Sequence, residues 1–292
     1  MRKKSIPELD KLFEEIGTYR KSKEFDDLIQ FIKKFPHIAP YNAMLIHVQK
    51  PGSEYVASAA EWRRSFGRSI TPGARPLVTL RPFGPVAFVF DLSDTFGKVP
   101  FPEKLLNPFK VEGKISQSFF DQFTANLISD GILYTEADHG TSSAGFIQTG
   151  NSNREMKIYT STKELWVSIL YDLVVNRNHP TETKFATVLH ELGHMYCGHL
   201  GSPNLKWWDD RRNLDIFQRE FEAESVCWLV CERMGINNPS AEYLSGYLNN
   251  NIEIPNISID AVLKSVAIVE SMMNGIKYPR KEIITHTIEL NK

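Results

Sequence analysis

The chain has 292 residues, and its 34 lysine and arginine residues almost balance 35 aspartate and glutamate residues. Hydrophobic residues make up 42% of the chain, which is typical of a globular protein with one large domain or two smaller ones. The net charge of −1 excludes a global attraction to nucleic acid, and no apolar run is long enough to span a membrane. Three cysteines are too few for a disulfide framework, so we expect a cytoplasmic protein without a membrane partner.

The first part of the chain combines helices with a small β-rich region. Apolar periodicity predicts three helices before residue 50, at 7–19, 25–34 and 41–48. Prolines and glycines then recur, and the β-rich runs 76–81 and 85–91 flank the short turn Pro82-Phe83-Gly84. Two such runs around a turn are typical of a β-hairpin. After the proline-rich stretch 99–110 we place a domain boundary near residue 112.

The segments between residues 113 and 175 alternate in type. We predict a helix at 116–128, a Gly/Ser/Asn-rich loop or hairpin at 138–153 and a strand at 156–160. The segment 165–174 fits either a strand or a helix.

Helices are predicted for most of the remaining chain. One begins near Thr181, after His179-Pro180, and a second spans 214–234 and stops before Gly235. Two more are predicted in the tail, at 240–249 and 259–274.

The most informative motif is His190-Glu191-Leu192-Gly193-His194. In a helix, residues i and i+4 lie one turn apart on the same face, so both imidazoles can reach one cation with the glutamate beside them. Zinc suits this pattern because it accepts neutral imidazole nitrogens in a tetrahedral shell. The glutamate can take a proton from water that the metal has acidified. We therefore predict zinc ligands at His190 and His194 and a general base at Glu191.

The remaining residues of this helix support the prediction. At about 100° per residue, four apolar side chains form one narrow stripe, and both histidines point nearly opposite to it. The stripe consists of Phe185, Leu189, Leu192 and Tyr196. We expect this helix to bury the stripe and to present the histidines on its other side. The alternative, two ordinary surface histidines, is disfavoured because the next long helix offers a third ligand.

That third ligand is expected from helix 214–234. On a helical wheel, Glu220 and Glu224 share a face with apolar residues of the helix. A buried unpaired carboxylate costs several kcal/mol, so we expect a metal ion and its histidines to compensate these charges. The alternative is an ion pair with an arginine, but Arg219 and Arg233 point away from this face. The pattern itself leaves open which of the two glutamates binds the metal.

Two histidines and one glutamate leave a fourth zinc position open for water. The longer motif with a third histidine is not matched, because Cys197 and Leu200 occupy its glycine and histidine positions. His199 lies one position before the place of the third histidine in that motif, so we predict that it is not a zinc ligand. Glu222 and Glu232 are predicted to lie on a solvated face of their helix. Cys197, Cys227 and Cys231 are predicted to be small buried side chains of the core.

Two segments, FATVLHELGHMYCGHLG and REFEAESVCWLVCERMGI, resemble the ImmA/IrrE family of metallo-endopeptidases over about residues 182–236. In that family the HExxH motif supplies two zinc ligands and the base, and a downstream helix supplies a glutamate ligand. The resemblance places this ligand at Glu220, and it places Glu224 where an acid orients a ligating histidine. At the position of Glu224 the family has the shorter Asn or Asp, so this chain departs from the family pattern there. The resemblance also implies a specific protein substrate, such as a helix-turn-helix repressor.

A second resemblance, over about residues 41–97, is to the N-terminal region of ArdC-type antirestriction proteins, which bind single-stranded DNA. Its landmarks are the Pro51-Gly52 break, Trp62, and the turns at Gly67 and Gly73. Basic residues are interleaved here with Trp62 and Phe66, at Arg63, Arg64, Arg68, Arg75 and Arg81. Such a cluster is either a solvated helix face or a site for single-stranded DNA.

The sequence thus predicts an α+β fold in three parts. Residues 1–112 form a smaller ArdC-like helical and β region. Residues 113–236 form a zincin-like metallopeptidase domain whose HExxH helix packs on a small sheet, and residues 237–292 form a helical extension packed on it. The predicted function is zinc-dependent hydrolysis of peptide bonds in a protein substrate. The alternatives are an antirestriction protein that binds single-stranded DNA, and a zincin-like protein that binds a partner without cleaving it.

Overall fold

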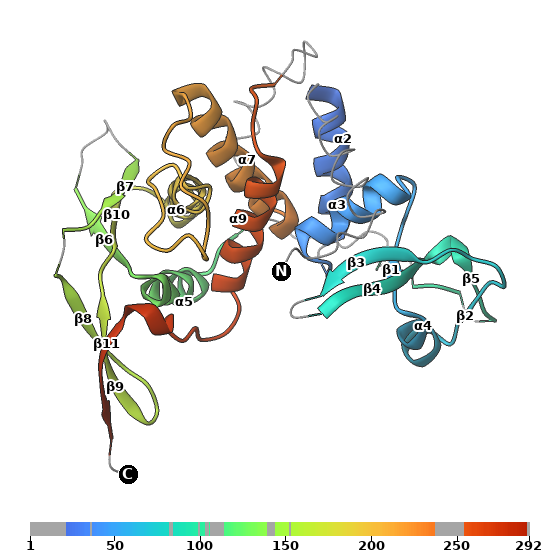
Figure 1. The fold of residues 1–292 in the computed structure, drawn as a ribbon, viewed down its shortest axis with the longest axis horizontal. Coiled ribbons are helices and arrows are strands. Elements are labelled where there is room, and N and C mark those ends of the chain that lie inside the picture. The colour runs from blue at the N-terminus through green and yellow to red at the C-terminus, as the bar shows by residue number, and fades with distance from the viewer. Residues whose placement is uncertain are drawn as a thin grey trace, which may run out of the picture.

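The computed structural model describes residues 22–35, 37–81, 84–98, 100–102, 105, 114–138, 144–151, 153–236 and 254–290. Over these residues the protein is α+β, with helices in the middle and small sheets toward both sides (Figure 1). The predicted helices 7–19 and 240–249 and the boundary near residue 112 lie outside the described residues. None of the helices in the described part of the chain is both long and apolar enough to cross a membrane.

The N-terminal region contains the helices α2 (Ser22–Lys33), α3 (Pro40–Gln49) and α4 (Ala59–Phe66). Pro40 begins α3, because proline has a preset φ and no amide hydrogen that the first turn would leave unpaired. Both ends of α4 are capped. The Ser58 hydroxyl accepts the amide of Glu61, and Gly67 closes the helix with a φ of +60°.

The strands of this region form the predicted hairpin and two short additions. Strand β3 (Leu77–Arg81) pairs antiparallel with β4 (Gly84–Asp91), which confirms the hairpin, and β1 (Val56–Ala57) pairs with the other edge of β4. A separate two-stranded ladder joins β2 (Ser69–Ile70) to β5 (Thr95–Phe96).

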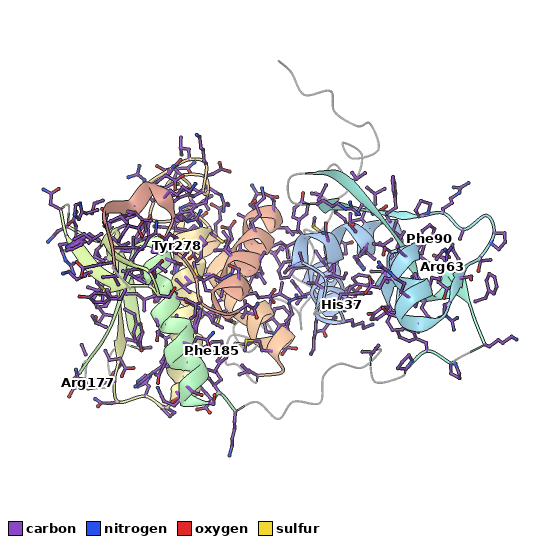
Figure 2. The ribbon with its side chains drawn as sticks, turned by 90° about the horizontal axis from the view of Figure 1, so that it is seen from below. His37, Arg63, Phe90, Arg177, Phe185 and Tyr278 are labelled. Atoms are coloured by element: carbon purple, nitrogen blue, oxygen red, sulfur yellow. The ribbon has the colours of Figure 1, made fainter. Side chains whose placement is uncertain are left out.

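A small aromatic core joins α4 to the hairpin. Trp62 is fully buried, with its ring centroid between 5.2 and 5.6 Å from those of Tyr55, Phe66 and Phe101. Its indole N–H donates to the carbonyl oxygen of Phe90 at 2.8 Å. Figure 2 shows this region at the opposite end of the molecule from Arg177. Trp62, which is interleaved with the predicted basic cluster, therefore serves the core and cannot stack on a base.

Two three-stranded sheets follow α5 (Gln117–Asn126). The first has the order β6-β10-β7. Its central strand β10 (Tyr171–Asn176) runs parallel to β6 (Ile132–Ala137) and antiparallel to β7 (Gly145–Thr149). The expected loop or hairpin 138–153 thus contains a strand, β7, whose partner is 25 or so residues further along the chain.

The second sheet has the order β11-β9-β8. It is antiparallel throughout and consists of β8 (Glu155–Tyr159), β9 (Lys163–Ser168) and β11 (Ile284–Glu289). The ambiguous segment 165–174 therefore spans the end of β9 and the start of β10. The expectation of a helical C-terminal extension is incomplete, because this part of the chain also contains β11, which pairs with β9 and helps to cover the buried side chains Leu165 and Val167.

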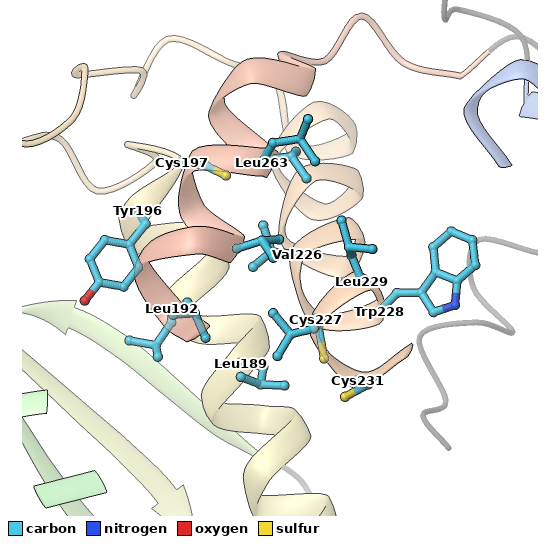
Figure 3. Close-up of a cluster of buried hydrophobic side chains, with 14 of the residues drawn as sticks. Leu189, Leu192, Tyr196, Cys197, Val226, Cys227, Trp228, Leu229, Cys231 and Leu263 are labelled. Carbon is cyan, nitrogen blue, oxygen red and sulfur yellow. The ribbon is translucent and has the colours of Figure 1, made fainter. Parts of the chain in front are cut away.

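The remaining helices are α6 (Thr181–Tyr196), α7 (Ile216–Met234) and α9 (Ile259–Met272). Figure 3 shows Leu192, Val226 and Leu263, one from each helix, in the buried cluster between them. N-terminal residues belong to the same core, since the rings of Phe25 in α2 and Phe221 in α7 lie 5.6 Å apart. The hydrophobic core thus continues across the expected division between residues 1–112 and 113–236.

One buried carboxylate holds the N-terminal loops together. Asp91 is 1% exposed and accepts the backbone amides of Glu54 and Ser93 at 2.9 and 3.1 Å. The ammonium of Lys50 lies 3.3 Å away. Burial by itself raises the pKa of Asp91, but the hydrogen bonds from Ser93 and Glu54 and the charge of Lys50 outweigh it and lower the pKa below its usual value.

Asp91 should therefore stabilise the fold in a pH-dependent way. Since its pKa is lower in the folded state, its contribution is present above roughly pH 4 and disappears as the pH falls through the folded value. We expect Asp91→Asn to reduce the free energy of unfolding in urea by about 1–3 kcal/mol at neutral pH, and by less in acid. Asp94→Asn, at a more exposed partner of Lys50, is the matched control with a smaller effect. A difference between wild type and Asp91→Asn that grows in acid would contradict this.

Candidate metal centre

Helix α6 has the two faces that its sequence predicts. The apolar stripe is buried, with Phe185, Leu189 and Leu192 at 0% exposure and Tyr196 at 2%. The side chains of His190 and His194 keep 22% and 15% exposure on the other side. Contacts of α6 with β7 and β10 put this helix against the first sheet. The histidines are thus held by a rigid, well-packed helix.

Helix α7 reaches the histidine side of α6 because the two backbones approach closely. A Cβ atom added at Gly193 would lie 2.9 Å from the Cα atom of Ala223 and 3.0 Å from its carbonyl oxygen. Only glycine at 193 and a small residue at 223 allow this approach. Gly193 lies between the two histidines, and Ala223 lies between Glu220 and Glu224. The crossing therefore sets which side chains of the two helices face each other.

The crossing brings His190, His194 and Glu220 together. The two Nε2 atoms lie 3.1 Å apart. Oε2 of Glu220 lies 3.5 Å from Nε2 of His190, and its other oxygen, Oε1, lies 3.6 Å from Nε2 of His194. Ligand atoms about 2.0–2.1 Å from a tetrahedral zinc ion lie roughly 3.3–3.4 Å from one another. The three separations, which involve both oxygens of Glu220, are close to this spacing, and two imidazole nitrogens with one carboxylate are a donor set that suits a zinc ion.

Glu224 lies on the other nitrogen of His190. Its Oε1 atom is 3.3 Å from Nδ1 of that ring, on the side away from the converging Nε2 atoms. An ionised carboxylate accepts a hydrogen bond, so this contact favours a proton on Nδ1 and a free lone pair on Nε2. Of the two glutamates that the sequence left open, Glu220 thus faces both Nε2 atoms, and Glu224 has the position of an orienting group.

Strong electrostatic coupling accompanies this geometry. Burial by itself lowers the pKa of His190, but the hydrogen bonds and charges of Glu220 and Glu224 raise it to about 10. The hydrogen bonds from His190 and His194 hold the pKa of Glu220 well below its usual range. These two shifts describe the same attraction from its two sides. A cation bound between the imidazoles and the carboxylate would compensate the charge of Glu220 in place of the proton on the histidines.

Glu191 occupies the space between α6 and the edge of the first sheet. Its Oε2 atom accepts the backbone amide of Ile147 in β7 at 3.0 Å. Burial raises the pKa of Glu191. A carboxylate that is fixed by a hydrogen bond and has a raised pKa is suited to accept a proton near neutral pH.

The prediction that Glu222 belongs to a solvated face is wrong. Glu222 is fully buried, and its carboxylate accepts two hydrogen bonds from Arg211 at 2.6 Å each and one from His199 Nε2 at 2.9 Å. The reason is that the segment between α6 and α7, which carries His199 and Arg211, and the backbone at Ser258, just before α9, cover this face of α7. Glu232 pairs with Lys33 of α2 and is also partly covered.

His199 lies beside the two histidines of α6 and not among the converging atoms. Its Nδ1 atom lies 3.0 Å from Nδ1 of His194. Cys197, His199 and Glu222 form a second group with ligand-type atoms within 4.8 Å of one another. Both oxygens of Glu222 already bind Arg211, so this group does not fit a metal ion. The predicted burial of all three cysteines is confirmed.

Comparisons with known proteins identify no family. No protein-family model and no curated protein matches the chain. Among solved structures, the metal-free crystal structure of the antirestriction protein ArdC from the R388 plasmid covers 80% of this chain and 81% of that chain, with 15% sequence identity and a TM-score of 0.32. A similarity at this TM-score does not define a shared fold. The ImmA/IrrE and ArdC-type resemblances therefore stay predictions.

The close crossing of α6 and α7 can be tested with Gly193→Ala. Alanine normally stabilises a helix by about 1 kcal/mol relative to glycine. Here we expect the added methyl to push the helices apart and to lower the free energy of unfolding by about 1–3 kcal/mol, as overpacking does, measured in urea. The control is Gly52→Ala, where an added Cβ meets nothing within 4 Å. If Gly193→Ala were as stable as the wild type, the contact with Ala223 would not limit the crossing.

Proposed function

We propose that this protein is a zinc-dependent endopeptidase with a zincin-like catalytic region. The observation that carries the proposal is the convergence of His190, His194 and Glu220, at separations that suit tetrahedral zinc, with Glu191 on the adjacent position of the same helix. A purely structural metal site has no need of a fixed, partly buried carboxylate beside it. The proposed ligands are these two histidines and Glu220, and the proposed general base is Glu191.

The chemistry follows from the positions of the side chains. When bound, zinc supplies a Lewis acid that polarises a carbonyl group and acidifies water. Glu191 accepts the proton of the attacking water and delivers it to the departing amine nitrogen. The Ile147 amide keeps the Glu191 carboxylate in one orientation during this transfer. Glu224 keeps the His190 ring oriented through its Nδ1 atom.

The first sheet supports a polypeptide as the substrate. Among the described strands, β7 is an edge of this sheet, since its one partner there is β10. An extended peptide can bind a sheet edge through main-chain hydrogen bonds. A strand added beside β7 would pass Ile147 and therefore Glu191. A cavity of about 210 Å³ near the end of β7, lined by Thr149, Tyr171 and Leu200 among others, offers room for a side chain of such a peptide.

The metal site can be tested by elemental analysis of purified protein. We expect about one zinc ion per chain, retained on gel filtration in wild type and lost in His190→Ala and in Glu220→Ala. Glu224→Gln is the matched control, because its amide oxygen can still accept from Nδ1 of His190, and it should keep its zinc. Full zinc content in His190→Ala would rule out the ligand set. Loss of zinc in Glu224→Gln together with its retention in Glu220→Ala would make Glu224 the ligand.

Peptidase activity can be tested with Glu191→Gln. This variant keeps an acceptor for the Ile147 amide and leaves the proposed ligands in place, but it cannot accept a proton at neutral pH. We expect the zinc-loaded wild type to generate new protein N-termini in a cell lysate, detected by mass spectrometry, and Glu191→Gln to generate none at the same zinc content. Identical N-termini with both proteins would contradict the proposed mechanism.

The single-stranded DNA partner stays a prediction. The buried Trp62 offers no base-stacking surface, and Arg68 is engaged by Thr95 through a 2.8 Å hydrogen bond. Binding of a single-stranded oligonucleotide that weakens steeply with salt, together with no cleavage by the zinc-loaded protein, would favour the DNA-binding alternative over the endopeptidase.

A further inference from the structure

A buried chain of polar groups leads away from His194. Nδ1 of His194 contacts Nδ1 of His199 at 3.0 Å, and Nε2 of His199 contacts Oε2 of Glu222 at 2.9 Å. Two nitrogens of Arg211 bind the same carboxylate at 2.6 Å each, and the Ser258 amide donates to it at 2.7 Å. His199 is 3% exposed and Glu222 is fully buried. We call His194, His199, Glu222 and Arg211 the buried polar chain.

The backbone after α6 is shaped to form this chain. Gly198 has a φ of +81°, which turns the backbone so that the amide of His199 donates to the carbonyl oxygen of His194 at 3.0 Å. A Cβ at Gly198 would lie only 2.0 Å from the carbonyl oxygen of Asp209. Arg211 is tied to the same place, because its amide donates to the Gly198 carbonyl oxygen at 2.9 Å. The turn thus brings His199 back to His194 and Arg211 to Glu222.

The proton positions in the chain follow from its chemistry. Arg211 donates only, and its two short hydrogen bonds favour an ionised Glu222 that accepts only. His199 must then carry a proton on Nε2 and, as a neutral ring, expose a lone pair on Nδ1. His194 must in turn donate from Nδ1, which leaves the lone pair of its Nε2 atom directed at His190 and Glu220. A ring with this tautomer is ready to bind a metal ion.

We propose that His199 is a positioning residue that, with Glu222 and Arg211, fixes the tautomer and orientation of His194 for metal binding. The inference rests on the metal site of the proposed function. It gives His194 the support that Glu224 gives directly to His190, with a second histidine inserted between ligand and carboxylate. Removal of such a support is expected to weaken zinc binding without removing a ligand.

A second buried ion pair provides a matched comparison. Asp130 is 3% exposed, accepts from Arg280 at 2.7 and 3.0 Å, and accepts from the hydroxyl of Tyr196 in α6 at 2.9 Å. Like the Glu222–Arg211 pair, this is a buried carboxylate bound by an arginine and linked to α6. Its link is Tyr196, on the apolar side of the helix, and not a histidine. If buried ion pairs acted on zinc binding only through general stability, both pairs would have the same effect.

The test measures zinc affinity by competition with a chromophoric chelator, and stability by urea unfolding, for the full chain. We expect His199→Leu to weaken zinc binding about 10- to 100-fold. His199→Gln keeps an acceptor and a donor and should retain most of the affinity. Asp130→Asn should lose stability and keep the zinc affinity of the wild type. If His199→Leu does not fold, Glu222→Gln, which no longer fixes the tautomer of His199, is expected to bind zinc more weakly than Asp130→Asn.

Two results overturn the inference while leaving the proposed function intact. One is zinc affinity in His199→Leu, or in Glu222→Gln, equal to that of the wild type. The other is an equal loss of affinity in Asp130→Asn, which would make the effect one of general stability. A wild-type protein that binds no zinc would instead overturn the proposed metal site itself.

Discussion

The close contact between Gly193 and Ala223 determines where every group of the candidate site lies. Two helices with ordinary side chains at these positions would be held further apart, and the carboxylates of α7 would not reach the imidazoles of α6. The contact is supported on both sides, since α6 packs on the first sheet and α7 packs on α2 and α9. Backbone proximity is thus the condition for the arrangement of the candidate site, and the surrounding core maintains it.

Helix α7 uses three glutamates at alternate positions in three different environments. Glu220 keeps 37% side-chain exposure and faces the converging nitrogens of both histidines. Glu224 faces the outer nitrogen of His190, and Glu222 is buried with Arg211 and His199. Alternate residues on a helix point in widely different directions, so one short segment can serve both the site and its supports. The site is therefore built with its supporting contacts and not from three isolated side chains.

Much of this could be predicted from local patterns. The burial of the apolar stripe of α6 and the hairpin of β3 and β4 follow from periodicity and turn residues, and the structure confirms both. Long-range burial could not be predicted in this way. Glu222 has a polar position on an isolated wheel, but His199 and Arg211, from the segment before α7, and the Ser258 amide, from a distant part of the sequence, remove the solvent from that side.

The contacts of His199 and the strand β11 could not be predicted, for related reasons. His199 departs by one position from a known spacing, and its contacts with His194 and Glu222 depend on the turn at Gly198, which the spacing does not reveal. A strand such as β11 depends on a partner, β9, more than a hundred residues earlier in the chain. Strand propensity is weak evidence without knowledge of that partner.

The late position of α9 and β11 in the chain has a consequence for biosynthesis. Helix α9 covers α6 and α7, its N-terminal segment gives Glu222 the Ser258 amide, and β11 completes the sheet beside β9. While the polypeptide is still emerging from the ribosome, α6 and α7 exist without this cover, and their apolar faces are open to chaperones and to misassembly. The cover over α6 and α7 and the Ser258 contact to Glu222 are complete only when residues 254–290 have been translated and have docked.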